Sequence, residues 1–277
     1  MACHDLTIVK NTPLMSEPSV LISFADGIAR ITLNRPERLN SFTDAMHADL
    51  RAGLAALRQN AALRVLVLTG AGRGFCAGQD LQDRAVAPGA EAPDLGASIE
   101  RNYAPLILAL RQLPVPVIAA VNGVAAGAGA NLALACDLVI AARSASFVQA
   151  FCKIGLIPDS GGTLFLPQRI GMARAMGLAL LGEKLSAETA EAWGLIWRCV
   201  DDLQLADEVD RLAQHFAQAP TRALARSKEA MYVASERLLA EQLALEARMQ
   251  RELGWSDDYR EGVAAFMAKR TPRFTGR

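Results

Sequence analysis

The chain has 277 residues, enough to bury a large hydrophobic core in one α/β domain, with or without a small appendage. Lysine and arginine together number 29, as do aspartate and glutamate, so no net field favours a nucleic acid or an anionic membrane. Hydrophobic residues make up 52% of the chain and aromatic residues only 5%. This composition is typical of closely packed helices around a buried sheet.

The cysteines argue against a metal site and against a disulfide framework. They are odd in number, widely spaced and without a Cys-x-x-Cys pair, so we expect a reducing, cytoplasmic environment and no bound metal. His4, Asp5 and Lys10 interrupt the N-terminus, which therefore does not read as a signal peptide. No run approaches the roughly 18 apolar residues of a membrane span, so we expect no membrane partner.

The first predicted elements are a strand and an amphipathic helix. Residues 28–33 carry alternating β-branched side chains and stop at Asn34-Arg35-Pro36, which predicts a strand followed by a loop. Thr43 is a suitable N-cap for the helix that follows. Four apolar side chains then recur at spacings of four, four and three and share one helix face: Met46, Leu50, Leu54 and Leu57.

The next segment alternates buried strands with glycine-rich loops and helices. Residues 65–69 predict a strand covered on both faces, and a glycine-rich loop follows from Gly70 to Gly78. Prolines and glycines in residues 83–98 predict a mobile surface loop of the kind that borders substrate pockets. Residues 99–113 predict a helix.

The pattern of strand, loop and helix then repeats. Residues 117–121 predict a second buried strand, which leads into Gly123, Gly127 and Gly129. A helix over 130–135 and a strand over 138–140 follow. This alternation predicts an α/β fold with a mainly parallel sheet.

The C-terminal third changes character, because strand signals almost disappear from Thr221 onward. A long helix is predicted there, because apolar residues recur at spacings of seven and four positions, at Leu238, Leu245 and Met249. A second helix over 257–269 carries Tyr259, Val263 and Phe266 on one side. Such an apolar face needs a partner, either the core or another subunit.

The glycine-rich loops allow three interpretations. Residues 72–77 match the G-x-G-x-x-A pattern of dinucleotide binding, but that fold requires a helix there and an acid ending a second strand about 20 residues later. Tight turns alone would explain the glycines but not their recurrence after two separate strands. Two such loops at neighbouring strand ends can instead direct backbone N–H groups to one point, which makes an oxyanion hole. A helix starting near Gly129 would add its positive end.

Several segments match one known family in order and combination. They are Asn34-Arg35-Pro36 with Leu39-Asn40, and residues 70–81, 116–123, 155–163, 187–196 and 259–270. On these segments the chain resembles the crotonase superfamily of enoyl-CoA hydratases and isomerases over nearly all of its length after residue 18. The resemblance implies a spiral of ββα units at 19–210, after an N-terminal extension at 1–18. A helical trimerisation region at 211–277 would follow, assembled as a homotrimer or a dimer of trimers.

The resemblance also implies where an acyl-CoA thioester would bind. Gln79 and Ala128 match the residues whose backbone N–H groups form the oxyanion hole. The coenzyme A part of the substrate would be held by one loop and by two residues of the last helix, often supplied by a neighbouring subunit; no permanently bound cofactor is implied. The matching residues are Arg38, Leu39, Ala77, Asp80 and Leu81 in the loop, and Phe266 and Lys269 in the helix.

The reaction type depends on which carboxylates are present. Hydratases of the family use two glutamates, but Asn131 and Phe151 occupy those positions here and would only line the substrate pocket. Neither can exchange a proton with water at neutral pH, which argues against simple hydration. Asp159 matches the single catalytic aspartate of the family's isomerases, where it would move a proton between acyl carbons. The alternative is that Asp159 caps the helix beginning after Gly162.

Only the resemblance to known family members indicates which acyl group the substrate carries. Residues 71–81, 123–130 and 174–182 look most like family members that convert a ring-1,2-epoxyphenylacetyl-CoA to an oxepin-CoA in phenylacetate degradation, with related double-bond shifts in unsaturated acyl-CoA. An enoyl-CoA hydratase and a non-catalytic acyl-CoA-binding relative remain alternatives. Serine hydrolase chemistry is disfavoured, because the three histidines have no G-x-S-x-G motif to accompany them.

Overall fold

Two β-sheets form the centre of the computed structural model, which describes residues 18–84 and 93–277. The larger sheet has the order β1-β2-β3-β5-β7-β10, and the smaller has the order β4-β6-β8-β9. Among the strand pairs of these described residues, only β1–β2 and β8–β9 are antiparallel. The strands are β1 (Val20–Ala25), β2 (Ile28–Leu33), β3 (Val65–Gly70), β4 (Gly74–Cys76), β5 (Val117–Val121), β6 (Val124–Ala126), β7 (Leu138–Ala142), β8 (Ser146–Val148), β9 (Lys184–Ser186) and β10 (Arg198–Val200).

The chain winds through the two sheets as a spiral. Each turn places one strand in the larger sheet and the next strand in the smaller one, as in β3 to β4, β5 to β6 and β7 to β8. Helices then carry the chain to the following turn. This arrangement confirms the predicted spiral of ββα units. It also brings the short loops after β4 and β6 side by side, because β4 pairs with β6.

The sequence patterns explain the main elements. In α1 (Asp44–Gln59), Oγ1 of Thr43 accepts a hydrogen bond from the backbone N–H of Met46 at 3.2 Å, as an N-cap should. The predicted apolar stripe of this helix is buried, and so is every residue of β5. Strands covered on both faces lose the alternation of a half-exposed strand and become continuously apolar.

The remaining elements of the core include several that the sequence does not reveal. The strands absent from the prediction are β1, β4, β6, β8, β9 and β10. Strand β4 lies where a dinucleotide-binding fold would need a helix, so that interpretation is wrong. Half of the predicted loop at 83–98, residues 85–92, lies outside the described residues. Residues 95–98 form a helix, so the prediction of a loop is wrong there. The helices here are η2 (Leu81–Arg84), α2 (Leu95–Ser98), η3 (Ile99–Tyr103, a π-helix), α3 (Ala104–Arg111), α4 (Ala128–Ala135), η4 (Ala150–Ile154), α5 (Gly162–Leu181), α6 (Ala187–Ala192), η5 (Asp202–Gln204) and α7 (Leu205–Ala217).

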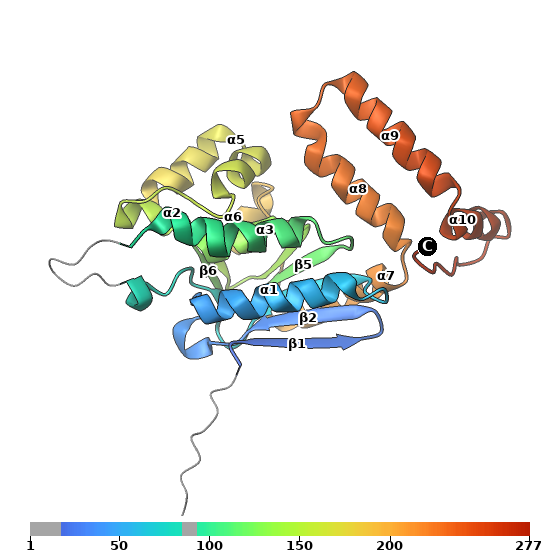
Figure 1. Cartoon of the computed structure of the whole chain (residues 1–277). Helices are drawn as coiled ribbons and strands as arrows, with labels where there is room; N and C mark the ends of the chain where they lie inside the picture. Colours follow the sequence, from blue (N-terminus) through green and yellow to red (C-terminus); the bar gives the residue numbers. More distant parts are fainter. Residues whose placement is uncertain (1–17, 85–92) are drawn as a thin grey trace, which may run out of the picture.

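The last helices project from the core as a separate arm (Figure 1). The arm consists of α8 (Thr221–Val233), η6 (Ala234–Glu236), α9 (Leu239–Gly254) and α10 (Asp257–Met267). Lys228 on α8 forms an ion pair with Asp137 at 2.9 Å, and the Tyr232 hydroxyl bonds the same carboxylate, so α8 is fixed to the core. The expected start of the helical region, residue 211, falls inside α7, which packs on the larger sheet.

Two details of the arm differ from the sequence prediction. Leu238 precedes α9 and is exposed, whereas Leu245 and Met249 of the same predicted stripe are buried. The last helix ends at Met267, so Lys269 follows it instead of lying on its face. Lys269 has a φ of 51°, which is not a helical value. The prediction that the last helix includes Lys269 as well as Phe266 is therefore wrong.

Candidate active site

One cavity of about 690 Å³ lies where the loops after β4 and β6 meet the segment after η4. Its walls are mostly apolar, and the charged side chains among its described lining residues are Lys153 and Asp159. The residues that line it are Ala77, Gly78, Gln79, Leu81, Pro93, Leu95, Ile99, Tyr103, Ala126, Gly127, Ala128, Ala150, Phe151, Lys153, Ile154, Leu156, Ile157, Pro158, Asp159 and Ser160. The cavity thus brings Gln79, Ala128 and Asp159 together from three distant parts of the chain.

Glycines hold the loops of Gln79 and Ala128 against each other. Gly78 has a φ of 88°, and a Cβ there would lie 2.9 Å from the carbonyl oxygen of Ala126. A Cβ on Gly129 would lie 2.3 Å from the carbonyl oxygen of Cys76. No other residue fits these positions without a backbone shift. The glycines are therefore needed for close approach of the two loops, as well as for a turn.

Ala128 is the first residue of α4, directly after Gly127, whose φ is 52°. Backbone N–H groups in the first turn of a helix have no partner inside that helix, and they carry its partial positive charge. The cavity therefore receives the N-terminal end of α4. The helix begins two residues before the predicted start at Ala130, which places Ala128 itself in this first turn.

Asp159 lies in a tight turn just before α5. The next two residues, Ser160 and Gly161, both have positive φ values of 50° and 84°. The hydroxyl of Ser160 donates to Oδ1 of Asp159 at 2.8 Å. The N-cap of α5 is Gly161, with no side-chain capping bond, so the structure does not show Asp159 capping that helix. Asp159 is instead one of the residues that line the cavity.

Phe151 and Asn131 have different surroundings, although both were expected to line the pocket. Phe151 is in the cavity wall, beside Gly127. Asn131 is fully buried behind the wall. Its Nδ2 donates to the backbone oxygen of Asp159 at 2.8 Å, and its Oδ1 accepts from Nε2 of Gln149 at 2.9 Å. Asn131 thus contacts the acid's backbone and does not border the cavity.

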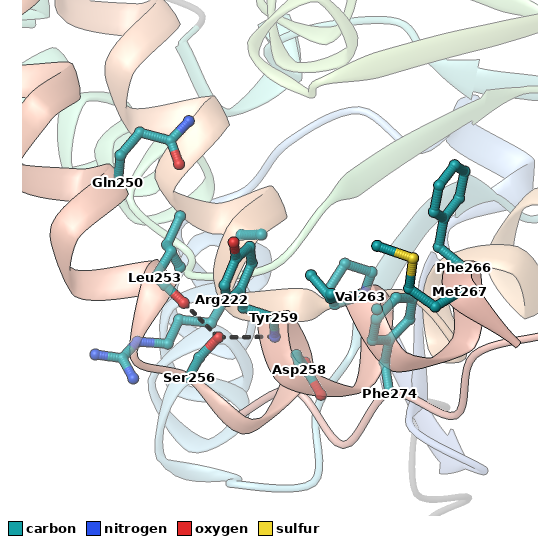
Figure 2. Close-up of a pocket in the computed structure, with 13 residues that line it drawn as sticks. Arg222, Gln250, Leu253, Ser256, Asp258, Tyr259, Val263, Phe266, Met267 and Phe274 are labelled. Carbon is teal, nitrogen blue, oxygen red and sulfur yellow. Dashed lines mark hydrogen bonds between the residues drawn. The ribbon is translucent and has the colours of Figure 1, made fainter.

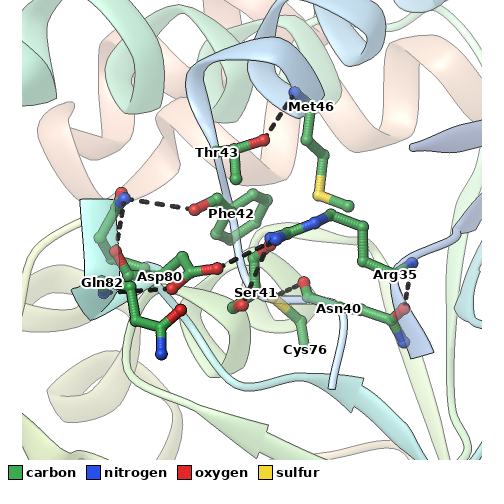
Figure 3. Close-up of polar contacts among 10 residues, drawn as sticks. Arg35, Asn40, Ser41, Phe42, Thr43, Met46, Cys76, Asp80 and Gln82 are labelled. Carbon is green, nitrogen blue, oxygen red and sulfur yellow. Dashed lines mark hydrogen bonds and ion pairs between the residues drawn. The ribbon is translucent and has the colours of Figure 1, made fainter. Parts of the chain in front are cut away.

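The loop expected to hold coenzyme A is braced by an ion pair (Figure 3). Nη2 of Arg35 contacts Oδ2 of Asp80 at 3.0 Å, and the backbone N–H of Gln82 donates to Oδ1 at 3.2 Å. Burial opposes the charge of Asp80, but the Arg35 and Gln82 hydrogen bonds outweigh it and lower the pKa of this carboxyl. The Asp80 side chain therefore stabilises the loop and does not line the cavity.

Some of the other residues of this loop line the cavity and some do not. Ala77 and Leu81 line it, and Leu81 is 58% exposed. Arg38 is exposed and Leu39 is half-buried, in a left-handed conformation just after a short helix, η1 (Pro36–Arg38). Neither lines the cavity.

Phe266 and Lys269 do not reach this cavity within one chain. Phe266 is 81% exposed and borders a different, apolar pocket of about 480 Å³ on the arm, together with Tyr259, Val263 and Phe274 (Figure 2). Lys269 is exposed beyond the end of α10.

The sequence prediction missed the wall formed by η3. Tyr103 is buried, and its hydroxyl donates to Oε1 of Gln79 at 2.5 Å. Ile99 and Leu95 line the same wall. π-helical turns often occur at functional sites, but a π-helix has no distinct sequence period, so residues 99–103 look like ordinary core helix.

Other reactive groups do not extend the site. Burial raises the pKa of the Cys76 thiol to about 12, so it is not a thiolate at neutral pH. Within residues 18–84 and 93–277, no cluster of histidine, cysteine and acidic side chains could hold a metal ion. Over the same residues, no helix has the length and apolar character to cross a membrane.

Known proteins resemble this chain along nearly its whole length. Residues 23–277 match the family model described as enoyl-CoA hydratase/isomerase. The chain is 59% identical over 258 residues to the 1,2-epoxyphenylacetyl-CoA isomerase of Escherichia coli (strain K12), which covers 93% of this chain and 98% of that protein. It is 51% identical over 263 residues to a probable enoyl-CoA hydratase of Rhodobacter capsulatus, and this match covers 95% of this chain and 100% of that protein. The crystal structure of the Bacillus anthracis enoyl-CoA hydratase superposes with a TM-score of 0.88 at 34% identity, covering 94% of this chain and all of that one, 100%.

Proposed function

The chain belongs to the enoyl-CoA hydratase/isomerase family, and on this basis we propose that it is a CoA-thioester isomerase that converts a ring-1,2-epoxyphenylacetyl-CoA to an oxepin-CoA. The 59% identity to an isomerase with a substrate of that class supports the acyl group. Related double-bond shifts in unsaturated acyl-CoA require the same proton transfer. The activity would belong to the breakdown of phenylacetate or similar aromatic acids.

One observation carries the reaction type. Among the described residues that line the cavity, Asp159 is the only carboxylate, and it faces the same space as Gln79 and Ala128. Two carboxylates would be needed to activate a water and to protonate the neighbouring carbon in one step. One carboxylate can remove a proton from a carbon and return it to another.

The mechanism follows from these groups. The thioester oxygen lies against the backbone N–H groups of Gln79 and Ala128, which stabilise the negative charge that develops there. Asp159 takes a proton from the carbon beside the thioester, and the bonding electrons move to the carbonyl oxygen. In a double-bond shift, the proton returns to a more distant carbon. In ring expansion, the bond between the two epoxide carbons also breaks, and the proton goes to a ring carbon. Substrate and product then contain the same atoms.

The apolar wall fits such a substrate. Leu95, Ile99, Phe151 and Ile157 offer hydrocarbon surface to a ring or an aliphatic chain. Water near the enolate would compete for the proton, so an apolar wall favours isomerisation over hydration.

The remaining parts of the proposal concern coenzyme A and assembly. Coenzyme A is bound as part of the substrate, through the loop of Arg38, Leu39 and Leu81, and no cofactor stays bound between turnovers. The exposed Phe266 on the projecting arm supports contact with coenzyme A on a neighbouring subunit of a homotrimer or a dimer of trimers. The protein works in the cytoplasm. Light scattering coupled to size-exclusion chromatography distinguishes the two assemblies.

The proposal is tested by incubating the protein with three CoA thioesters and recording product masses and absorbance: ring-1,2-epoxyphenylacetyl-CoA, a 3-enoyl-CoA and crotonyl-CoA. A change in absorbance distinguishes an isomerised product from unreacted substrate. Isomerisation leaves the mass unchanged, whereas hydration of crotonyl-CoA adds one water and would support an enoyl-CoA hydratase instead. Asp159→Asn is expected to lower kcat by about 10²–10⁴-fold, the usual contribution of a positioned acid or base.

Asp26→Asn is the matched control for that substitution. Asp26 lies in the β1–β2 turn with a φ of 51°, a conformation that asparagine also adopts, so its replacement should leave kcat unchanged. Full activity in Asp159→Asn would contradict the proposal. A chain that binds acyl-CoA but converts none of the substrates would favour a non-catalytic relative.

A further inference from the structure

We propose that Asn131 and Gln149 form a buried amide pair that positions Asp159 relative to the N-terminal end of α4. Both side chains are almost completely buried, with exposed fractions of 0% and 2%. They are linked to each other and to the backbone of Asp159, and neither lines the cavity. The role rests on the proposed function, because it gives Asn131 an effect on activity through Asp159.

The first step concerns the turn that carries Asp159. Ser160 and Gly161 are both in the left-handed region, which is costly for the serine and persists only where neighbouring contacts hold it. The backbone oxygen of Asp159 accepts two hydrogen bonds: one from the backbone N–H of Gly162 and one from Nδ2 of Asn131, each at 2.8 Å. The first bond is local to the turn. The second bond ties the turn to α4.

The second step concerns the element at the other end of that bond. Asn131 is on α4, three residues after Ala128, whose backbone N–H is proposed to bind the thioester oxygen. One rigid turn of helix therefore sets the distance between the Ala128 amide and the backbone of Asp159. The proton acceptor and the oxyanion donor are thus attached to a common support, although 31 positions separate them along the chain.

The third step concerns the fit of the amide. Gly162 packs directly on the Asn131 side chain, since a Cβ at Gly162 would lie 2.4 Å from Nδ2. Nε2 of Gln149 donates to Oδ1 of Asn131 at 2.9 Å, which orients the amide with its NH₂ group toward Asp159. A carboxylate at position 131 could accept from Gln149 but could not donate to the Asp159 oxygen. The asparagine is therefore suited to anchoring, and it explains why a second acid is absent here.

The experiment uses Asn131→Asp, which removes the donor to Asp159 and keeps an acceptor for Gln149. Hydrogen–deuterium exchange of the 157–162 segment is expected to accelerate about fivefold, as for the loss of one buried hydrogen bond. A displaced acid costs rate more than binding, so kcat should fall by about 10–100-fold while KM stays within about threefold. Gln149→Met removes the donor that orients the Asn131 amide, so the amide can rotate. This variant should also accelerate exchange at 157–162 and lower kcat, each by less than Asn131→Asp does.

Asn102→Asp is the matched control. Asn102 is also buried, at 3% exposure, and its Nδ2 donates to Oδ1 of Asp44 at 2.7 Å, between η3 and the first residue of α1. This variant should lose thermal stability but keep the parent exchange rate at 157–162. If Asn102→Asp accelerates exchange at 157–162 as much as Asn131→Asp does, the effect is general destabilisation and the anchoring role is wrong.

Two further outcomes separate this inference from the proposed function. Parent-like exchange and parent-like kcat in Asn131→Asp would overturn the anchoring role while leaving the isomerase intact. Unchanged kcat with raised KM would overturn it too, since the amide would then act on substrate binding. Faster exchange at 157–162 in a chain that turns over no CoA thioester would support the anchor and reject the isomerase.

Discussion

The hydroxyl of Tyr103 donates to the side-chain oxygen of Gln79 at 2.5 Å and joins the π-helical wall of the cavity to the loop proposed to form half of the oxyanion hole. Nε2 of Gln79 donates in turn to the backbone oxygen of Phe42 at 3.2 Å. Gln79 is therefore held from both sides. The position of its backbone N–H depends on a residue 24 positions away in the sequence.

Tyr103→Phe should reduce kcat/KM for the isomerisation by about 3–10-fold. The variant leaves a partly buried amide oxygen without this donor, a loss worth about 1 kcal/mol, and the Gln79 loop gains freedom. Tyr232→Phe is the control, because it breaks a comparable hydrogen bond to Asp137, remote from the cavity. It should lower the melting temperature and retain kcat/KM; equal kinetic losses in both variants would contradict a local role for Tyr103.

Gly129→Ala should abolish most activity and destabilise the fold. The new Cβ would meet backbone and Cβ atoms of Cys76 at 2.3–2.8 Å, which must move the Gln79 and Ala128 loops apart. Overpacking of this kind costs about 1–3 kcal/mol, and loss of one oxyanion donor costs about 10²–10³-fold in kcat. Urea unfolding and steady-state kinetics measure the two effects.

Gly177→Ala provides the contrast on α5, where nothing lies within 4 Å of the new Cβ. It should be neutral or stabilise the protein by up to about 1 kcal/mol, because alanine favours a helix interior over glycine. A Gly129→Ala enzyme with parent activity would mean that the two loops do not need their close contact.

Lys228→Met should destabilise the protein by about 3–5 kcal/mol, since removing one partner leaves the largely buried carboxylate of Asp137 without its counter-charge. Urea denaturation provides the measurement. The double variant Lys228→Met/Asp137→Asn should recover much of the lost stability. In the parent protein the backbone N–H of Val117 donates to Oδ2 of Asp137 at 2.7 Å, and the amide oxygen of an asparagine can accept the same hydrogen bond. A single-variant loss below about 1 kcal/mol would show that the ion pair does not fix α8 to the core.

The carboxyl of Glu261 should remain ionised at pH values below the ordinary pKa of a glutamate. Hydrogen bonds from Arg270 and from the backbone N–H of Arg273 lower its pKa from 4.5 to about 2. A depressed pKa in the folded state stabilises the fold above pH 4.5, and this contribution is lost as the pH falls towards 2. Carboxyl NMR titration measures the pKa directly. In Arg270→Gln it should rise towards the ordinary glutamate range; an unshifted Glu261 in the parent would contradict the pairing.

The fold could be predicted in outline because its strongest signals are local. Apolar continuity identified β3 and β5, and the spacing of four apolar residues identified α1 with its cap at Thr43. Strands β4 and β6 were missed, since each has only three residues and no period can be read over so short a run. The end of α10 was placed two residues late, because a left-handed residue after a helix has no distinctive sequence when it is a lysine.

The features of the candidate site also fall into two groups, those that the sequence determined and those that only the tertiary structure decided. The sequence alone determined that two glycine-dependent turns follow buried strands, that no glutamate stands at positions 131 and 151, and that a single aspartate follows Ile157-Pro158. Each of these depends on residue type at one position or on a few neighbours. Only the tertiary structure decided that Asn131 lies behind the wall, that Asp80 is held by Arg35, and that Tyr103 reaches Gln79. These contacts join residues 24 to 45 positions apart. Side-chain partners at such separations are chosen by how the spiral stacks its turns, which no local pattern of residues encodes.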